Sequence, residues 1–424
     1  MIVKRVLLLA TTTGYQTRMF GDAAERLGVE LVFATDRCDQ LTDPWSDGAI
    51  PVRYHQEATT VETIITESER SQIHGLLAIG DQPTVAAAYA ARLLGLTGNP
   101  PDAVKAARDK RLTRERLSAA GLSVPRVLVL SRFADPGTAV ERLDFPVVLK
   151  PAVLTGSRGV MRADDRDGFI AAFERLGRLL ETDDVRALHD PASDVVIVES
   201  FIPGREFALE GVLQKGELHT LAIFEKPDPL DGPFFEETIY ITPPRLQERV
   251  QELMREEIAA AARALGLHHG PVHAECRVNL DGVFVLEVAA RPIGGLCARA
   301  LTFTGAEGEA SSLEELLLRH ALGERVDQWQ PGSGASGVMM IPIPEGGVYR
   351  RVEGIERARQ VPDVWDIRIT AKPDQTLVPL PEGASYLGFI FARAKTSDAV
   401  EHALRTAHTA LTFVVDRALP LAGR

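Results

Sequence analysis

Two glutamates face each other across a predicted β-hairpin late in the chain. Glu275 and Glu287 lie on predicted strands that flank the turn sequence Asn-Leu-Asp-Gly at 279–282. Their positions are symmetric about Asp281, and with that register their Cβ atoms lie about 5 Å apart on one face. Because two acids so close repel each other, we expect a positive charge between them. A divalent metal carrying substrate phosphates fits, since Mg²⁺ takes one or two carboxylates and completes its shell with water and phosphate. The ordinary alternative is a solvated hairpin face with two unrelated acids.

An arginine and two glycines follow this hairpin in the sequence EVAARPIGG. A guanidinium at Arg291, beside a metal pair, suits developing phosphoryl or carboxylate charge. Gly294 and Gly295 let backbone approach a ligand without side-chain obstruction. Alternatively, Arg291 pairs with a surface acid and Pro292 only ends a strand.

Two lysines and a glycine loop precede the hairpin. Lys110 lies in a predicted helix, and Lys150 ends the apolar strand FPVVLKP, which points its ammonium into a cleft. The loop LTGSRGV contains Gly156, Ser157 and Gly159, and such a loop can donate backbone N–H groups to phosphates. The Walker A pattern G-x-x-x-x-G-K-[ST] is absent. Taken alone, the loop is better explained as an ordinary hairpin turn.

A further candidate segment is VVIVESFIPGREFALEGVL, at 195–213. Glu199 ends one predicted strand and Glu206 lies on the next. The extended backbone between them, up to Ile202, is suited to hydrogen bonding with an adenine edge, and Glu206 to accepting from ribose hydroxyls. A strand-turn-strand with two surface acids is the alternative.

The composition is that of a globular protein with more than one domain. The chain has 424 residues, 45% of them hydrophobic and 25% charged. The net charge of −12 argues against nucleic acid or an anionic membrane surface as partner. A phosphate ligand must therefore be bound by a few placed cations.

The cysteines and the N-terminus favour a cytoplasmic location. Cys38, Cys276 and Cys297 are far apart, which matches neither a disulfide framework nor zinc spacing and favours a reducing cytosol. The start MIVKRVLLLA has a short apolar run without a cleavage site and reads as a strand, and no run is long enough for a membrane span.

The elements that must position these residues begin with a β-α-β pattern, typical of a parallel sheet. We expect strands at 3–9, 29–34 and 75–79 and helices at 16–27 and 83–94. The loop at 11–14 lacks G-x-G-x-x-G, so this part is interpreted as scaffold and substrate wall rather than a dinucleotide site.

Turn clusters at 98–101 and 330–334 mark two predicted boundaries. Helices are expected at 102–120, closed by a left-handed Gly121, and at 247–265, 313–322 and 399–411. Strands are expected at 127–129, 147–149, 195–198, 206–213, 220–224, 274–278, 283–288, 337–343 and 386–392.

In their order along the chain, these parts resemble the ATP-grasp superfamily, over roughly residues 100–320. The resemblance implies an ATP-grasp fold of mixed α/β and α+β type, with a Rossmann-like β-α-β lobe at 1–100 and a C-terminal α+β domain at 331–424. The ATP-grasp domain at 101–330 would comprise a small lid lobe at 124–204 and a large lobe at 205–330. ATP would be bound by Lys110, Lys150, the loop Gly156, Ser157 and Gly159, backbone at Glu199 and Ile202, and Glu206. Glu275 and Glu287 would ligate Mg²⁺, with Mn²⁺ as a substitute.

The segments FEKPDPLDGPFFEETIYITP, EVAARPIGG and SGVMMIPIPEGG are similar to the L-amino acid ligases, which condense two amino acids into a dipeptide. This implies that Glu237 and Tyr240 face the amino-acid site, together with Arg291, Gly294 and Gly295. Many superfamily members read E-x-N at the second metal acid, whereas here Ala289 replaces the Asn. The number of metal ions is therefore open.

The resemblance implies a reaction in which a substrate carboxylate attacks the γ-phosphate and gives acyl phosphate and ADP. The amine of a second substrate then attacks, with Arg291 stabilising the oxyanion and either Glu237 or His273 as base. A carboxylase or purine-type ligase with the same fold is the first alternative. A nucleotide-binding regulator without turnover is the second, disfavoured because all the charged groups are present. The substrates would be small carboxylates and amines, and a homodimer is common for this kind of fold.

Overall fold

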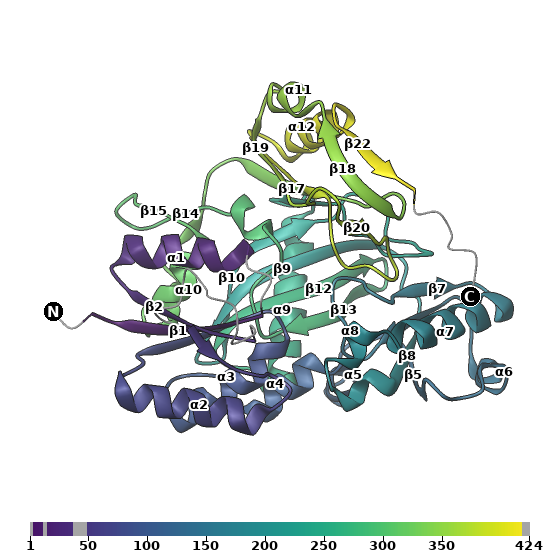
Figure 1. Ribbon diagram of the computed structural model, residues 1–424, viewed down its shortest axis with the longest axis horizontal. Helices are drawn as coiled ribbons and strands as arrows, with labels where there is room; N and C mark the ends of the chain where they lie inside the picture. Colours follow the sequence, from purple (N-terminus) through teal and green to yellow (C-terminus); the bar gives the residue numbers. More distant parts are fainter. Residues whose placement is uncertain (1–2, 12–14, 37–48, 418–424) are drawn as a thin grey trace.

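The computed structural model describes residues 3–11, 15–36 and 49–417, so Cys38 and residues 12–14 of the expected first loop lie outside the described residues. Figure 1 shows four groups of elements, with the N-terminal part and the small lobe side by side below and the C-terminal part above. Cys276 and Cys297 are buried and free.

The N-terminal sheet is parallel, in the order β3-β2-β1-β4. Its strands are β1 (Arg5–Ala10), β2 (Glu30–Thr35), β3 (Ala49–Pro51) and β4 (Gly75–Ile79), and its helices are α1 (Tyr15–Leu27), α2 (Glu57–Arg70) and α3 (Gln82–Leu93). Five consecutive residues of β1 are buried, as expected for a parallel strand covered on both faces. The predicted β-α-β start is confirmed, and α2 is an addition to it. Because β1 and β4 are parallel, the segments after both strands lie at one edge of the sheet.

The predicted helix over 102–120 is wrong in one respect: it is two helices, α4 (Pro101–Arg108) and α5 (Lys110–Ala119). Asp109 interrupts them with an extended backbone (φ −92°, ψ 110°), and its side chain accepts from the N–H groups of Arg111 and Leu112. A carboxylate in this position satisfies orphan donors of the next helix. The break makes Lys110 the first residue of α5. The expected left-handed Gly121 is confirmed, with φ at +76°.

The small lobe is an antiparallel sheet in the order β5-β8-β6-β7. Its strands are β5 (Val127–Ser131), β6 (Val147–Pro151), β7 (Met161–Ala163) and β8 (Val195–Ser200), with helices α6 (Pro136–Ala139), α7 (Arg166–Leu180) and α8 (Asp183–Arg186). Helix α7 was not among the predicted elements. It buries Phe169, Phe173 and Leu176, spaced three and four residues apart, against this sheet.

An eight-stranded sheet forms the centre of the molecule, in the order β13-β12-β9-β10-β11-β17-β21-β19. The strands are β9 (Arg205–Gln214), β10 (Glu217–Glu225), β11 (Ile239–Thr242), β12 (Gly270–Asn279), β13 (Gly282–Ala289), β17 (Ala335–Ile341), β19 (Val364–Ile369) and β21 (Gly388–Ala394). Helices α9 (Glu248–Leu265) and α10 (Leu313–Ala321) accompany it. Strands β11 and β17 are antiparallel neighbours, with Tyr240 opposite Val338. One sheet therefore runs across the expected boundary at 330/331.

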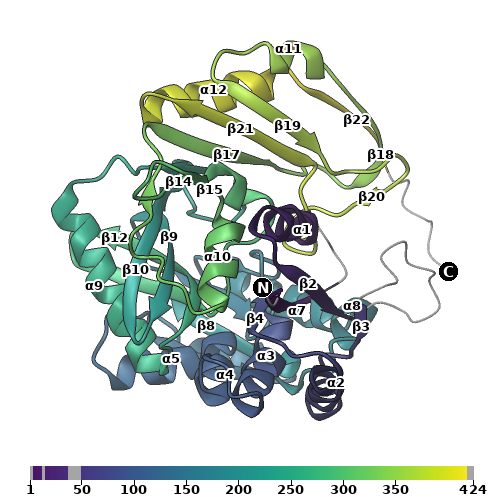
Figure 2. The same ribbon diagram turned by 90° about the vertical axis from the view of Figure 1, so that its left-hand side faces the viewer.

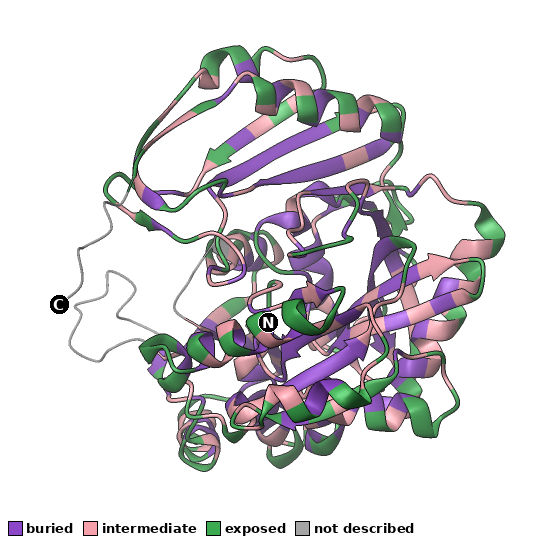
Figure 3. Cartoon of the chain, turned by 90° about the vertical axis from the view of Figure 1, so that its right-hand side faces the viewer, coloured by how far each residue is buried: buried purple, intermediate pink, exposed green. Residues whose placement is uncertain are grey.

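Two smaller three-stranded sheets complete the fold. They consist of β14 (Phe303–Thr304), β15 (Ala310–Ser311) and β16 (Gln330–Pro331), and of β18 (Gly347–Glu353), β20 (Thr376–Leu377) and β22 (Thr412–Asp416). Figure 2 shows α11 (Ile355–Arg359) and α12 (Ser397–Thr409) over the outer face of β17, β19 and β21. Figure 3 shows the central strands largely buried, with exposed residues gathered on helices and loops. Within the described ranges, every helix is too short or too polar to cross a membrane.

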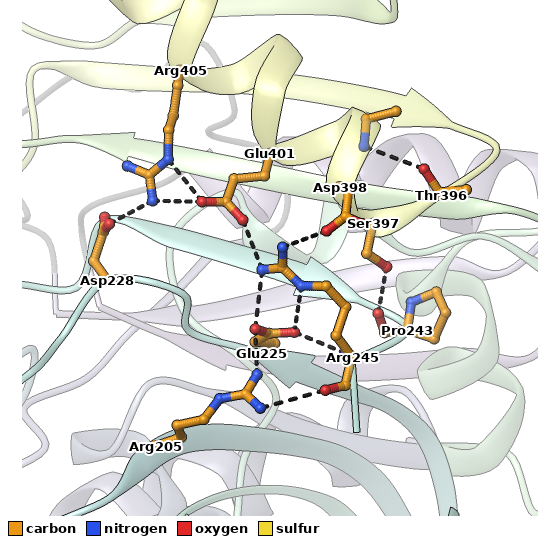
Figure 4. A network of polar contacts seen from close by, with 11 residues as sticks. Arg205, Glu225, Asp228, Pro243, Arg245, Thr396, Ser397, Asp398, Glu401 and Arg405 are labelled. Atoms are coloured by element: carbon orange, nitrogen blue, oxygen red, sulfur yellow. Dashed lines mark hydrogen bonds and ion pairs between the residues drawn. The ribbon is translucent and has the colours of Figure 1, made fainter. Parts of the chain in front are cut away.

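A network of ion pairs joins the end of β10 to helix α12 (Figure 4). Glu225 is buried and accepts from Arg245, at 3.0 Å to Nη2, and from Arg205. Arg245 also contacts Asp398 and Glu401 of α12, each at 2.7 Å. A carboxylate with two guanidinium partners is well compensated for its burial. The network fixes the chain just before Lys226.

Candidate active site

One cavity of about 1010 Å³ lies where the four parts of the molecule meet. The N-terminal part contributes the edge at which β1 and β4 end, including Asp81. The N-terminal part therefore forms one wall of the cavity, and its role as a substrate wall stays a prediction. The cavity is lined by all but one of the predicted site residues: Lys110, Lys150, Gly156, Ser157, Glu199, Ile202, Glu206, Glu237, Tyr240, Glu275, Glu287, Arg291, Gly294 and Gly295.

The exception is Gly159, for which the prediction of a phosphate-facing loop position is wrong. Its N–H donates to the carbonyl of Pro381 at 2.8 Å. With φ at +76°, a side chain here would be strained, and a Cβ would lie 3.0 Å from Leu176. Gly159 is therefore a packing position. Gly156 (φ +64°) and Ser157 (φ +57°) line the cavity in left-handed backbone, which is uncommon for Ser.

Glu275 and Glu287 are paired across β12 and β13, as the sequence predicts, but for a different reason. The hairpin closes with Asn279 opposite Gly282, a register that alone would pair Glu275 with Leu286. An irregularity between Glu275 and Cys276 leaves one extra residue, Leu286, on β13 and brings Glu287 opposite Glu275. Bulges of this kind re-aim side chains near sites.

Lys226 contacts three carboxylates from behind the cavity wall. Its Nζ lies 2.8 Å from Glu206 and 3.2 Å from Glu275 and donates a short hydrogen bond to Glu237. The three acids each offer an oxygen within 4.8 Å of the others, a spacing that suits a metal ion, but a lysine ammonium is already bonded to all three. Burial opposes the charge of Lys226, yet its acid neighbours outweigh this and raise its pKa well above the usual value. The predicted metal pair thus has Glu275 in this cluster and Glu287 outside it.

Glu287 instead faces Lys110. The Lys110 Nζ lies 3.7 Å from the Glu287 carboxylate and donates to the Leu154 carbonyl at 2.9 Å. Lys110 reaches both because it begins α5, after the break at Asp109. It therefore links the hairpin to the glycine loop.

Lys150 is held by a buried ion pair with Glu199, at 2.5 Å. Arg114, at 2.7 Å, is the second partner of this carboxylate. Burial lowers the pKa of Lys150 to about 8, against the attraction of Glu199. Burial would raise the pKa of Glu199, but Arg114 and Lys150 outweigh it and hold that pKa at about 2. The Glu199 side chain thus positions a lysine at the cavity.

Glu206 and Ile202 share a partner that sequence analysis did not identify. Arg277 donates to Glu206 at 3.0 Å and to the Ile202 carbonyl at 2.8 Å. It is 3% exposed and lines the same cavity. Arg277 therefore fixes the segment proposed for the nucleotide, and one Glu206 oxygen is occupied by it.

Arg291 bonds Asp81 of the N-terminal part, with Nε 3.1 Å from the carboxylate. Burial opposes its charge, but Asp81 and Glu287 outweigh this and raise its pKa. The alternative of a surface acid as its partner is wrong, because the Asp81 side chain is 17% exposed and lines the cavity. Arg291 thus ties two parts of the molecule to one wall.

His273 and Glu237 were the two candidate bases, and they differ in their hydrogen-bond partners and in what shifts their pKa values. His273 Nδ1 makes a short hydrogen bond with buried Glu210, and Nε2 lies 3.4 Å from Glu275. Burial lowers its pKa, but these acids outweigh burial and raise it to about 9. A histidine protonated at neutral pH is a donor rather than a base. For Glu237, burial and then Glu275 raise the pKa above the usual range, against the attraction of Lys226.

The small lobe is fastened to the C-terminal part by Arg175 of α7 and by Arg158 of the glycine loop. Arg175 of α7 makes a bidentate pair with Glu382, at 2.5 and 2.8 Å, and Arg158 donates to the Glu382 carbonyl at 2.7 Å. The Arg175 and Glu382 side chains are 39% and 36% exposed, so solvent screens the pair. These contacts hold the small lobe over the cavity.

Removal of this fastening, in Arg175→Ala, is expected to raise KM for the ATP that the sequence resemblance implies by roughly two- to fivefold, because an exposed pair contributes about 0.5–1 kcal/mol. Steady-state kinetics at varied ATP would measure it. The control is Arg166→Ala, whose pair with Glu141 at 2.8 Å stays within the small lobe. Equal effects of both variants would contradict a role in closure.

Sequence analysis did not identify Lys226, Arg277 or Asp81 as residues of the site. It also did not predict that Glu210 and His273 form a buried pair. Lys226 had a usable signal, since it follows the apolar run Leu221–Phe224 in the way that Lys150 ends its strand. Ala289, in the place of the common Asn, is buried opposite His273. It offers no third ligand.

Comparison with known families agrees with this arrangement. The ATP-grasp N-terminal domain matches residues 21–98, the ATP-grasp domain matches 143–300, and L-amino acid ligase C-terminal domain 2 matches 339–416. The expected superfamily and subgroup are thus found in three separate segments.

Relatives and solved structures point the same way. The uncharacterized protein y4rH of Sinorhizobium fredii is 24% identical over 419 residues, 96% of this chain and 82% of that protein. The alanine–anticapsin ligase of Bacillus subtilis is 27% identical over 235 residues, 52% of this chain and 49% of the ligase. The crystal structure of an L-amino acid ligase from Bacillus licheniformis superposes with a TM-score of 0.79 at 25% identity, covering 98% of this chain and 99% of that one. The chain therefore contains an ATP-grasp domain, preceded by an ATP-grasp N-terminal domain and followed by the C-terminal domain 2 of the L-amino acid ligases.

Proposed function

We propose that this protein joins a carboxylic acid to an amine at the expense of ATP, with release of ADP and phosphate, and that both substrates are L-amino acids. The observation that carries the proposal is one cavity lined by Lys110, Lys150, Glu275, Glu287 and Arg291. This cavity thus combines cations suited to phosphate, carboxylates suited to a metal ion and a guanidinium suited to an oxyanion.

The residues present fit a metal-bound nucleotide. Glu275 and Glu287 oppose each other on the cavity wall, with side chains 20% and 27% exposed, so both are accessible yet partly desolvated. Mg²⁺, or Mn²⁺ in its place, would be held by these two carboxylates and would neutralise phosphate charge. Lys110 and Lys150 would bind phosphate oxygens, and the backbone near Ile202 with Glu206 would contact adenine and ribose.

The chain's own residues would then serve the two chemical steps. Phosphoryl transfer to the substrate carboxylate activates it as an acyl phosphate, and attack by the amine forms the amide while phosphate leaves. Arg291 would stabilise the developing oxyanion, and Glu237 would accept the amine proton, since His273 is held protonated. The glycine loop, fastened through Glu382, would exclude water from the reactive intermediate.

Amino acids are favoured as substrates by the match of the C-terminal segment to the L-amino acid ligases, together with the acid Glu237 in the wall. An acid in that place suits a substrate ammonium. Relatives of other kinds keep another ATP-grasp ligase or carboxylase as the alternative. The N-terminal section of the carbamoyl phosphate synthase large chain of Aquifex aeolicus, for example, is 29% identical over 177 residues.

The decisive experiment is a screen of amino-acid pairs for phosphate release, with mass spectrometry of the product and separation of ADP from AMP. We expect ADP, phosphate and a dipeptide in equal amounts. Stimulation by bicarbonate or a ribonucleotide amine instead would support the alternative, and AMP formation would contradict the acyl-phosphate route.

A further inference from the structure

An apolar region of the large cavity, called the pocket below, lies near Glu237, whose charge acts on Cys297 and Tyr386. It is walled by Cys297, Met340 and Phe389, with Tyr386 at its side, and all four line the cavity. Met340 lies on β17 and Phe389 on β21, so the wall belongs to the C-terminal part of the chain. The segment after β13 supplies Cys297.

These side chains form one surface. Cys297 Sγ lies 3.6 Å from Met340 Sδ, and the rings of Tyr386 and Phe389 have centroids 6.2 Å apart. At Gly295, whose φ is +61°, an added Cβ would lie 3.3 Å from the Phe389 ring and 3.9 Å from Cys297. The glycine thus lets the phenyl ring pack against the backbone beside the cavity.

The pocket carries no charge of its own. Burial raises the pKa of the Cys297 thiol and, together with Glu237, that of the Tyr386 hydroxyl, so both remain neutral. Cys297, Met340 and Phe389 are each less than 5% exposed. A charged group entering here would lose hydration. The charge beside these walls is the carboxylate of Glu237, which the substrate ammonium would already occupy.

We propose that this pocket receives the uncharged, apolar side chain of the amino acid whose ammonium group Glu237 binds, and that Met340 and Phe389 set the size accepted. The inference rests on the proposed function. It names aliphatic and thioether side chains as the substrate class at this end of the cavity. Amino acids with Asp, Glu, Lys or Arg side chains are excluded there.

The test compares Met340→Ala with Met339→Ala. These neighbours have similar burial, 4% and 3% exposed, but they lie on opposite faces of β17: Met340 in the cluster that borders the cavity, Met339 in the core beneath α12. Kcat/KM is measured for a series of amino acids from alanine to phenylalanine, with charged ones included. The product is identified by mass in every case.

For the wild type we expect kcat/KM at least about tenfold higher for apolar than for charged side chains of similar length. Met340→Ala should raise kcat/KM for larger side chains by roughly tenfold relative to kcat/KM for alanine. Met339→Ala should leave the order of substrate preference unchanged. The proposed pocket would be wrong if Met340→Ala kept the wild-type order of substrate preference. It would also be wrong if a charged amino acid were preferred both as the acid and as the amine substrate. Amide formation itself would still stand in either case. Failure of every amino-acid pair in the wild type would instead overturn the proposed function.

Discussion

Replacing Glu287 by glutamine is expected to lower the rate of ADP formation by roughly two to three orders of magnitude. The carboxylate lies on the cavity wall opposite Glu275, and its ion-pair partner in the structure is Lys110, at 3.7 Å. The amide keeps the shape but loses the charge that a divalent ion needs. Stability should change little, because the side chain is 27% exposed and its ion pair is long. An ADP-coupled assay at varied Mg²⁺ measures the effect, and higher Mg²⁺ should restore part of the rate.

A matched control lies in the same hairpin. Asp281→Asn makes the same chemical change in the exposed turn between β12 and β13 and should keep normal turnover. If Glu287→Gln retained the wild-type rate at low Mg²⁺, the assignment of this hairpin to the metal would be wrong.

Replacing Lys226 by methionine is expected to cost about 3–5 kcal/mol of folding free energy. The ammonium is 3% exposed and bonds Glu206, Glu237 and Glu275, so its removal leaves three partly desolvated carboxylates without their shared partner. The same three acids have oxygens within 4.8 Å of one another. The variant should therefore gain affinity for a divalent ion, and added Ca²⁺ or Mg²⁺ should recover part of the lost stability.

Urea denaturation with and without the ion measures both effects. Lys105→Met is the control, because its pair with Glu57, at 3.7 Å, is 40% and 38% exposed and should contribute at most about 1 kcal/mol. The double variant Lys226→Met with Glu237→Gln should recover part of the loss, since it also removes one unpaired acid. A midpoint for Lys226→Met equal to that of the wild type would show that the cluster does not depend on the ammonium.

Site residues could be predicted from the sequence where they belong to a series of motifs in a recognisable order along the chain. The lysines, the acid pair and Arg291 all reach the cavity. The partners of these residues were harder to predict. Asp81 and Arg291, for example, are 210 positions apart in the sequence and are brought together only by the tertiary fold. A strand pattern also cannot show an irregularity such as the one that brings Glu287 opposite Glu275, since it depends on how one extra residue is accommodated.

Local structure failed at one informative place. The residues on both sides of Asp109 favour a continuous helix, yet the carboxylate caps a new one and redirects the chain. Lys110 owes its position to that break. Helices α2 and α7 are missing from the prediction, although the apolar residues of α7 have the three- and four-residue spacing of a helix that packs on a core.

The continuous sheet across β11 and β17 bears on how such enzymes can be altered. Because Tyr240, which lines the cavity, is paired with Val338, removing the chain after residue 331 would leave β11 without its neighbouring strand and expose a sheet edge prone to self-association. Swapping whole C-terminal segments between relatives would disturb the same ladder. Exchange of individual side chains on β17 and β21 leaves the backbone pairing intact and is the gentler route to a new substrate range.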